Sequence, residues 1–270
     1  MKKSKKWLAT ALIVLSSSQI VWAEVESSFQ EALQAAEQGD PEAEFDLGMM
    51  YSDGKVVSQD YAQAVKWFRR AAEQRVSEAQ FNLGTMYYKG QGVRQDYEQA
   101  VKWYRRAAEQ GDDQAQAALG LMYYDGKGVN QDYAKSFGWF RKAAEQGNIA
   151  AQSALGMMYY NGKGMHHDYV KAFGWYRKAA EQGDAGAQAA LGMMFYKGQG
   201  VRQDYAQAVE WFRAAESQNN KAALNNLGVA YQFGRGVLQN RAVAQEWYGK
   251  ACDNGEQRGC DNYRRLKLGY

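Results

Sequence analysis

The sequence predicts an all-α protein, a right-handed superhelical α/α solenoid of six 36-residue helix-turn-helix repeats with a capping helix at each end. Two residue markers with one common period of 36 residues support this prediction. Leu-Gly pairs recur at Leu47-Gly48, Leu83-Gly84, Leu119-Gly120, Leu155-Gly156, Leu191-Gly192 and Leu227-Gly228. Tryptophans recur in the same phase at Trp67, Trp103, Trp139, Trp175, Trp211 and Trp247. Two markers that stay in phase through six copies indicate a repeat architecture.

The first element is a predicted signal peptide, residues 1–23. Four lysines precede an apolar stretch, which is followed by a polar segment, residues 16–19, and by Val21-Trp22-Ala23, after which we expect cleavage. The apolar stretch is shorter than the roughly 20 residues that span a bilayer, so we expect a periplasmic or secreted protein without stable membrane insertion. An uncleaved signal anchor is the alternative. Removing these four lysines from the 33 basic residues leaves 29 against 30 acidic ones, which argues against nucleic acid as a partner.

The second element is an N-terminal capping helix, predicted within residues 24–40. It ends in Ala35-Ala36-Glu37-Gln38-Gly39, which matches the end of the second helix of a repeat. Six repeats follow over residues 41–255. Residues 256–270 begin one more first helix, but Arg264 stands where the repeats have glycine, so this segment is predicted to be the C-terminal cap.

Each repeat contains a predicted first helix, helix A. In the third repeat Ala115, Leu119, Gly120 and Tyr123 fall on one face, as expected for an amphipathic helix. Helix A follows a short polar residue that can accept hydrogen bonds from free backbone amides, with Val76 as the exception. These capping residues are Asp40, Asp112, Asn148, Asp184 and Asn220.

A Gly-x-Gly turn connects helix A to the second helix, helix B, with Val56 in place of its second glycine in the first repeat. Helix B turns its tryptophan and alanines inward and ends before a glycine, except at Arg75 and Asn219. Small residues such as Gly48 are expected to let the two helices approach closely. Helix B is capped by Asp60, Asp96, Asp132, Asp168, Asp204 and Asn240.

Basic residues follow the tryptophans of helix B, as Arg69 and Arg70 follow Trp67. With Glu73 nearby, we interpret them as solvated surface charge. A functional role is the less favoured interpretation.

The repeat motif Ala-x-x-x-Leu-Gly-x-x-Tyr-x-x-Gly-x-Gly-Val-x-x-Asp-Tyr-x-x-Ala-x-x-Trp-x-x-x-Ala-Ala resembles the Sel1-like repeat (SLR) family of the tetratricopeptide superfamily, in its secreted bacterial type. The resemblance implies an exported, non-catalytic scaffold that binds a protein or an extended peptide. It also implies an alternative, a β-lactamase-like or penicillin-binding hydrolase acting on cell-wall peptide. Fold analogy does not choose between them.

The same resemblance implies a disulfide between Cys252 and Cys260, which lie on the last helix B and the following helix. Two cysteines in an exported protein suit one bridge that holds the terminal helix. Two reduced thiols are the alternative.

The helix A residues that are not needed for packing form a candidate partner-binding face, which the tetratricopeptide resemblance places on the concave side. Tyrosine and methionine offer contact area, and Asn82 and Asn226 match an asparagine that holds ligand backbone in peptide-clamping relatives. The alternative is that the tyrosines only cover neighbouring turns. The predicted partner-binding residues are Asn82, Tyr88, Lys89, Tyr124, Asp125, Tyr160, Asn161, Tyr196, Lys197 and Asn226.

Catalytic and metal sites find little support in the sequence. Ser52 and Lys55 fit Ser-x-x-Lys, but neither Ser-Asp-Asn nor Lys-Thr-Gly follows. The only histidine cluster, His166-His167-Asp168, has too few neighbouring ligand residues for a metal site. We therefore expect no catalytic residue, no metal and no cofactor.

Overall fold

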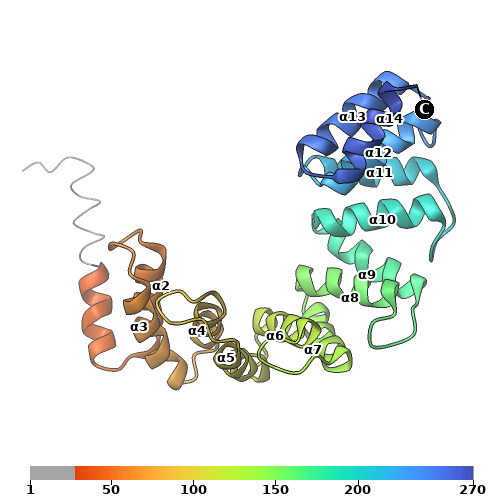
Figure 1. The fold of residues 1–270 in the computed structure, drawn as a ribbon. Coiled ribbons are helices and arrows are strands. Elements are labelled where there is room, and N and C mark those ends of the chain that lie inside the picture. Colours follow the sequence, from red (N-terminus) through yellow and green to blue (C-terminus); the bar gives the residue numbers. More distant parts are fainter. Residues whose placement is uncertain (1–27, 270) are drawn as a thin grey trace, which may run out of the picture. The chain divides into compact units, whose positions relative to one another are not determined.

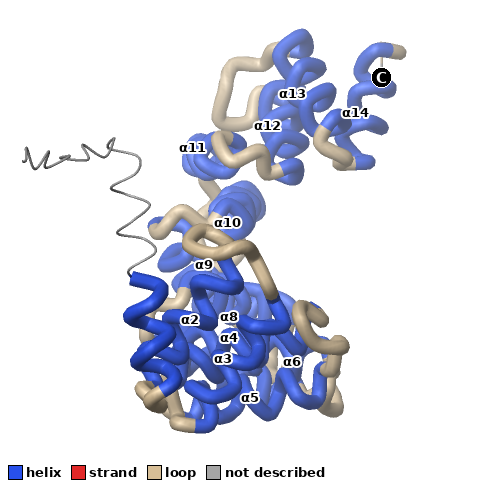
Figure 2. The backbone as a smooth tube through the Cα atoms, turned by 90° about the vertical axis from the view of Figure 1, so that its left-hand side faces the viewer, coloured by secondary structure: helices blue, strands red, loops and turns tan. Residues whose placement is uncertain are grey.

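The computed structural model describes residues 28–269, so the predicted signal peptide lies outside the described residues. Every regular element in the described range is a helix (Figure 2). No helix in that range is long and apolar enough to cross a membrane. The described residues divide into two compact units, with the boundary between Gln95 and Asp96.

The first unit contains a helix at residues 28–37 followed by α2 (Pro41–Asp53), α3 (Tyr61–Glu73) and α4 (Ser77–Lys89). Neighbouring helices α2, α3 and α4 pack in chain order. Ala36 of the first helix is buried together with Leu47 of α2 and Trp67 of α3. The helix at residues 28–37 therefore covers the apolar side of the first hairpin.

The second unit continues the alternation, and each helix packs on the next one along the chain (Figure 1). Helix A of each repeat carries an even number, and α14 is the last helix within the described residues. The all-α solenoid prediction is thereby confirmed. The ten helices are α5 (Tyr97–Glu109), α6 (Asp113–Asp125), α7 (Tyr133–Glu145), α8 (Ile149–Asn161), α9 (Tyr169–Glu181), α10 (Ala185–Lys197), α11 (Tyr205–Glu216), α12 (Lys221–Phe233), α13 (Arg241–Asp253) and α14 (Gln257–Lys267).

The predicted capping residues begin these helices. The carboxylate of Asp112, for example, accepts a hydrogen bond of 2.7 Å from the backbone N–H of Ala115. Val76 provides no side-chain cap, as predicted. Arg75 and Asn219, which stand where other repeats have glycine after helix B, adopt left-handed φ angles of 71° and 57°. The backbone turn is therefore kept even where glycine is lost.

The glycine of helix A marks the closest approach within each hairpin. A Cβ atom added to Gly156 of α8 would lie 2.6 Å from the ring of Tyr176 on α9. Tyr176 is buried, and its burial raises the pKa of its hydroxyl. The predicted role of the small helix A residue in close packing is confirmed.

A buried polar ladder also connects the repeats, and the sequence analysis did not foresee it. In α8 the Gln152 side chain is buried, donates to the carbonyl of Ala144 at 3.3 Å and accepts from Gln182 at 2.8 Å. The end of α7 is therefore bonded to helix A on both sides, through Gln152 of α8 and through Gln146, which donates to Gln116 of α6. The same pattern of a buried glutamine and a helix-end glutamine recurs at Gln116 with Gln146 and at Gln188 with Gln218.

The first repeat replaces the buried glutamine with Glu44, which is only 1% exposed. Arg70 pairs with this carboxylate at 2.6 Å and donates to the carbonyl of Ala36 at 2.8 Å. The interpretation of Arg70 as solvated charge was therefore wrong. A buried carboxylate needs a cationic partner, and Arg70 provides it.

Candidate partner-binding site

Three of the predicted tyrosines occupy one repeat position in successive A helices of the second unit. Tyr124, Tyr160 and Tyr196 lie just before the ends of α6, α8 and α10, and these helices contact one another in that order. All three side chains are half-buried. We call these three residues the tyrosine row.

Each member of the row is held by a second tyrosine at the start of helix B. Tyr124 packs edge-on against Tyr133 with ring centroids 5.2 Å apart, and the equivalent pair Tyr160 and Tyr169 is also 5.2 Å apart. Tyr196 meets its own partner at 5.1 Å. The contact fixes the ring orientation, because edge-to-face aromatic pairs are favourable arrangements.

The hydroxyl groups of the row differ in what they bind. The Tyr160 hydroxyl donates to the side-chain oxygen of Gln199 at 2.7 Å, in the turn of the next repeat. The Arg235 guanidinium donates to the Tyr196 hydroxyl and lies over that ring, 5.2 Å from its centroid. These two tyrosines do cover neighbouring turns. Among residues 28–269, no side chain or backbone group bonds the Tyr124 hydroxyl.

The residues that follow the row form an exposed polar rim. Asp125, Asn161 and Lys197 are all exposed. Asp125 pairs with Lys127 at 3.4 Å, and an exposed pair of this kind contributes little to stability. The rim is therefore a polar, solvent-exposed edge beside the tyrosine row.

Leu121 belongs to this surface, and the sequence analysis did not include it. It lies on α6 three residues before Tyr124, so both side chains share one face of the helix. It is 44% exposed, so its side chain adds apolar area to the surface beside Tyr124. The sequence does contain an indication of its position. Leu121 stands at the repeat position of Met157 and Met193, which lie between the predicted tyrosines.

The remaining predicted residues lie elsewhere in the two units. Asn82, Tyr88 and Lys89 are on α4 in the first unit, where the Asn82 amide makes a 3.6 Å contact to the sulfur of Met49. Asn226 is half-buried on α12 in the second unit. Within the second unit, then, the structure gathers Tyr124, Tyr160 and Tyr196 on successive A helices.

In the Ser-x-x-Lys motif, Lys55 forms an ion pair with Asp53. The ammonium of Lys55 lies 3.6 Å from the carboxylate of Asp53, and the carbonyl of Ser52 accepts a hydrogen bond from Gln59 at 2.8 Å. These contacts lie at the end of α2 and in the turn that follows it.

The histidine cluster borders an open hollow of about 500 Å³ beside α9. His166 and His167 are exposed, and the His167 ring stacks on Tyr169 with centroids 5.6 Å apart. Asp168 caps α9, and the backbone N–H of Lys171 holds the pKa of its carboxyl below the ordinary value. Within residues 28–269, no three histidine, cysteine or acidic side chains gather in an arrangement that could hold a metal ion.

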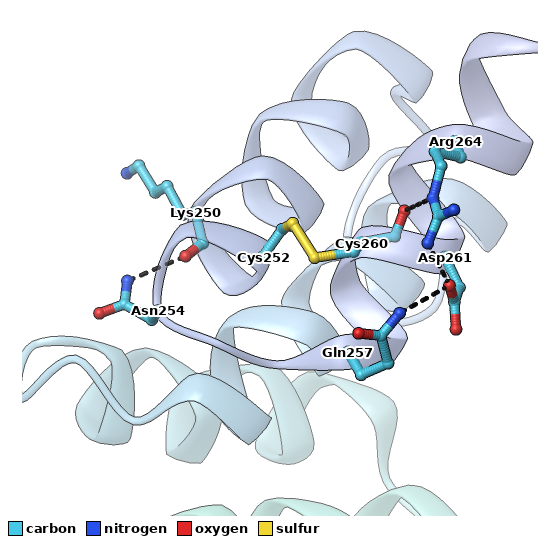
Figure 3. The surroundings of a disulfide bond; sticks show 7 residues. All are labelled: Lys250, Cys252, Asn254, Gln257, Cys260, Asp261 and Arg264. Atoms are coloured by element: carbon cyan, nitrogen blue, oxygen red, sulfur yellow. Dashed lines mark hydrogen bonds and ion pairs between the residues drawn. A yellow bond between two sulfur atoms is a disulfide. The ribbon is translucent and has the colours of Figure 1, made fainter.

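The disulfide implied by the resemblance is present. Cys252 near the end of α13 is bonded to Cys260 on α14, with the two Cα atoms 4.5 Å apart (Figure 3). Leu266 of α14 is buried against Tyr248 of α13. The bridge and this apolar contact together hold the final helix on the last hairpin.

Comparison with protein-family models identifies the family of this chain. The Sel1 repeat model matches six consecutive segments, residues 41–76, 77–112, 113–148, 149–184, 185–220 and 221–256. The chain belongs to the Sel1 repeat family. Sel1 repeat proteins are generally scaffolds for protein interaction. Nothing in the comparisons supports the hydrolase alternative.

Two solved Sel1 repeat structures are similar over most of the chain. One is c5321 of uropathogenic Escherichia coli, a protective antigen with 40% identity and a TM-score of 0.83 over 90% of this chain. The match covers 52% of c5321, so the chain spans about half the length of that protein. The other is a Sel1 repeat protein of Oxalobacter formigenes, with 34% identity and a TM-score of 0.73, which covers 84% of this chain and 99% of that one. No curated protein matches the chain.

Proposed function

We propose that this Sel1 repeat protein is a non-catalytic scaffold that binds a protein or extended peptide. The partner binds the exposed face of the A helices, which is the candidate partner-binding face predicted from the sequence. The observation that carries the proposal is the surface formed by exposed Leu121 and the tyrosine row. Family membership supports the scaffold class, and this surface supports the location.

The surface has the chemistry of a binding site whose side chains are already ordered. The tyrosine rings are held by their edge-on partners before any partner binds, so little side-chain freedom is left to lose on association. Leu121 and Tyr124 add apolar area and one free hydroxyl on the same helix face. Side chains at the centre of protein interfaces often cost about 2 kcal/mol or more when truncated.

We also propose that the protein is exported and works in the periplasm or outside the cell. The predicted signal peptide motivates this proposal. The Cys252–Cys260 bridge supports it, because disulfides persist mainly in oxidising compartments. That the similar Escherichia coli protein is a protective antigen agrees with the same location.

The binding proposal is tested with three immobilised proteins: wild type, Leu121→Ala/Tyr124→Ala, and the control Val170→Ala. Val170 is 69% exposed on α9, a B helix, so its truncation removes exposed apolar area that belongs to neither Leu121 nor the tyrosine row. Proteins retained from an extract of the source cells are identified by mass spectrometry, purified, and titrated by calorimetry against each variant.

We expect a retained protein whose affinity falls at least tenfold for the double variant and stays within twofold for the control. Circular dichroism must show the same helix content for all three proteins. Equal affinity for wild type and double variant would place binding elsewhere, and retention of no protein would contradict the scaffold proposal itself.

A further inference from the structure

A basic side chain lies over the tryptophan of helix B in five of the six repeats. Each cation comes three residues after its tryptophan and lies 4.2 to 4.8 Å from the ring centroid. The pairs are Trp67 with Arg70, Trp103 with Arg106, Trp139 with Lys142, Trp175 with Lys178 and Trp247 with Lys250. In the fifth repeat the third residue after Trp211 is Ala214. In the part of the chain that the structure describes, no lysine or arginine lies over Trp211.

A second cation is missing at the same repeat. In the third repeat Lys135 lies 5.5 Å from the ring centroid of Tyr123, and in the fourth Lys171 lies 5.5 Å from that of Tyr159. The fifth repeat has Gln207 in place of this lysine, beside Phe195 in place of the tyrosine. The two aromatic rings of this repeat have therefore lost both cations that the fourth repeat provides.

A pocket lies beside Gln207, one of the two positions where a cation is missing. It has a volume of about 240 Å³ and is lined by the rings of Phe173, Phe195 and Trp211 from α9, α10 and α11, together with Gln207 and the pair Arg177 and Glu181. The three helices follow one another within the second unit (Figure 1). The volume lies below the roughly 300 to 1,000 Å³ of sites for drug-sized ligands, so it fits one side chain.

Among the helices that line the pocket, α11 carries a net negative charge. Helix α11 carries Glu210 and Glu216 against the single basic residue Arg213, whereas α9 carries three basic residues against one glutamate. Arg177 does not offset this difference, because its guanidinium pairs with Glu181 at 2.7 Å. Of the six B helices, α11 alone has more acidic than basic residues.

We propose that this pocket binds the lysine or arginine side chain of a partner protein. In the fourth repeat Lys171 lies over Tyr159 and Lys178 lies over Trp175. The partner's cation takes the equivalent place beside Phe195 and Trp211. Attraction between a cation and the faces of Trp and Phe supplies the binding energy, and the net negative charge of α11 adds to it. The pocket is lined by residues of α9, α10 and α11, and its lining includes neither Leu121 nor a member of the tyrosine row.

The test follows the indole N–H signal of Trp211 in ¹H–¹⁵N spectra of the full chain after export processing. The probe is Nα-acetyl-arginine amide, and Nα-acetyl-citrulline amide is its uncharged analogue of nearly the same shape. Trp211→Phe assigns the signal. Trp175, which Lys178 already covers, is the internal control.

We expect a saturable shift of the Trp211 signal with the arginine probe, at least fivefold larger than with the citrulline probe, and no comparable shift at Trp175. Gln207→Lys/Ala214→Lys restores both cations of the fourth repeat and is expected to abolish the shift. Leu121→Ala/Tyr124→Ala is expected to keep it, which separates this site from the helix A surface.

Three results would overturn the proposal. They are equal shifts with both probes, a shift that persists in Gln207→Lys/Ala214→Lys, and no shift of Trp211 with arginine at any concentration up to tens of millimolar. Because Gln207→Lys/Ala214→Lys introduces residues that the fourth repeat already carries, it is expected to fold, and circular dichroism checks this.

Discussion

The close approach of the two helices in a repeat can be tested by replacing two glycines with alanine, one at a time, and comparing the stability of the two variants. Gly156→Ala places a Cβ atom 2.6 to 2.8 Å from three ring atoms of Tyr176. Gly174→Ala, on the partner helix α9, meets nothing within 4 Å. Both glycines lie inside α-helices, so the change in helix propensity is the same at the two positions.

The expected magnitudes follow from these contacts. Replacing glycine with alanine inside a helix stabilises it by about 1 kcal/mol. At Gly156 the new methyl group lies roughly 1 Å inside the ordinary carbon–carbon contact distance of about 3.5 to 4.0 Å. The Tyr176 ring is only 8% exposed and has little room to retreat, so overpacking costs about 1 to 3 kcal/mol. Gly174→Ala should therefore raise stability, and Gly156→Ala should fall below Gly174→Ala by about 1 to 3 kcal/mol.

Urea denaturation followed by far-ultraviolet circular dichroism measures both effects on one scale. We expect the midpoint of Gly174→Ala above that of wild type and the midpoint of Gly156→Ala below that of Gly174→Ala. Equal midpoints for the two variants would refute the argument that glycine is required there by packing.

Three further predictions concern the cap, the ladder and the helix start. Replacing Cys252 and Cys260 with alanine should destabilise α14 by about 2 to 3 kcal/mol, because a short loop is no longer closed in the unfolded chain, and amide hydrogen exchange in α14 should accelerate accordingly. Gln152→Ala removes two hydrogen bonds, one to the carbonyl of Ala144 and one from the amide of Gln182, and at about 0.5 to 1.5 kcal/mol per bond it should cost about 1 to 3 kcal/mol in urea denaturation. The lowered pKa of Asp168 means that its charge stabilises the fold above the ordinary carboxyl pKa of about 3.9, and that this contribution is lost as the pH falls through the lower folded-state pKa. The midpoint difference between wild type and Asp168→Asn should therefore be present at pH 7 and should close under strongly acidic conditions.

The sequence was sufficient for the fold because the repeat markers report local and short-range physics. A capping Asp or Asn, a glycine after the helix and a period of 36 residues each constrain the chain within one or two repeats. The left-handed φ angles of Arg75 and Asn219 show that the turn is set by its place in the repeat, even without glycine.

The polar ladder could not be predicted in the same way. Gln152 lies on helix A beside apolar residues, and its burial depends on which carbonyl of the preceding helix B it reaches. Arg70 was misjudged for the same reason, because its partner Glu44 is 26 residues earlier in the chain. Pairing across repeats depends on three-dimensional placement that one sequence does not contain.

The candidate surface was predicted in part. The recurrence of tyrosine before the turn identified Tyr124, Tyr160 and Tyr196, but the sequence could not show that only Tyr124 keeps an unbonded hydroxyl. Leu121 was missed because a leucine in a helix is usually buried, and its exposure follows from the packing of neighbouring repeats.

Binding of a partner to the exposed face of the A helices can be tested by photo-crosslinking in the cells that make the protein. Benzoylphenylalanine is introduced at position 121 in one strain and at position 170 in another, both positions being exposed on the second unit. We expect a discrete adduct with one protein from position 121 and none from position 170. The same adduct from both positions, or from position 170 alone, would contradict this expectation.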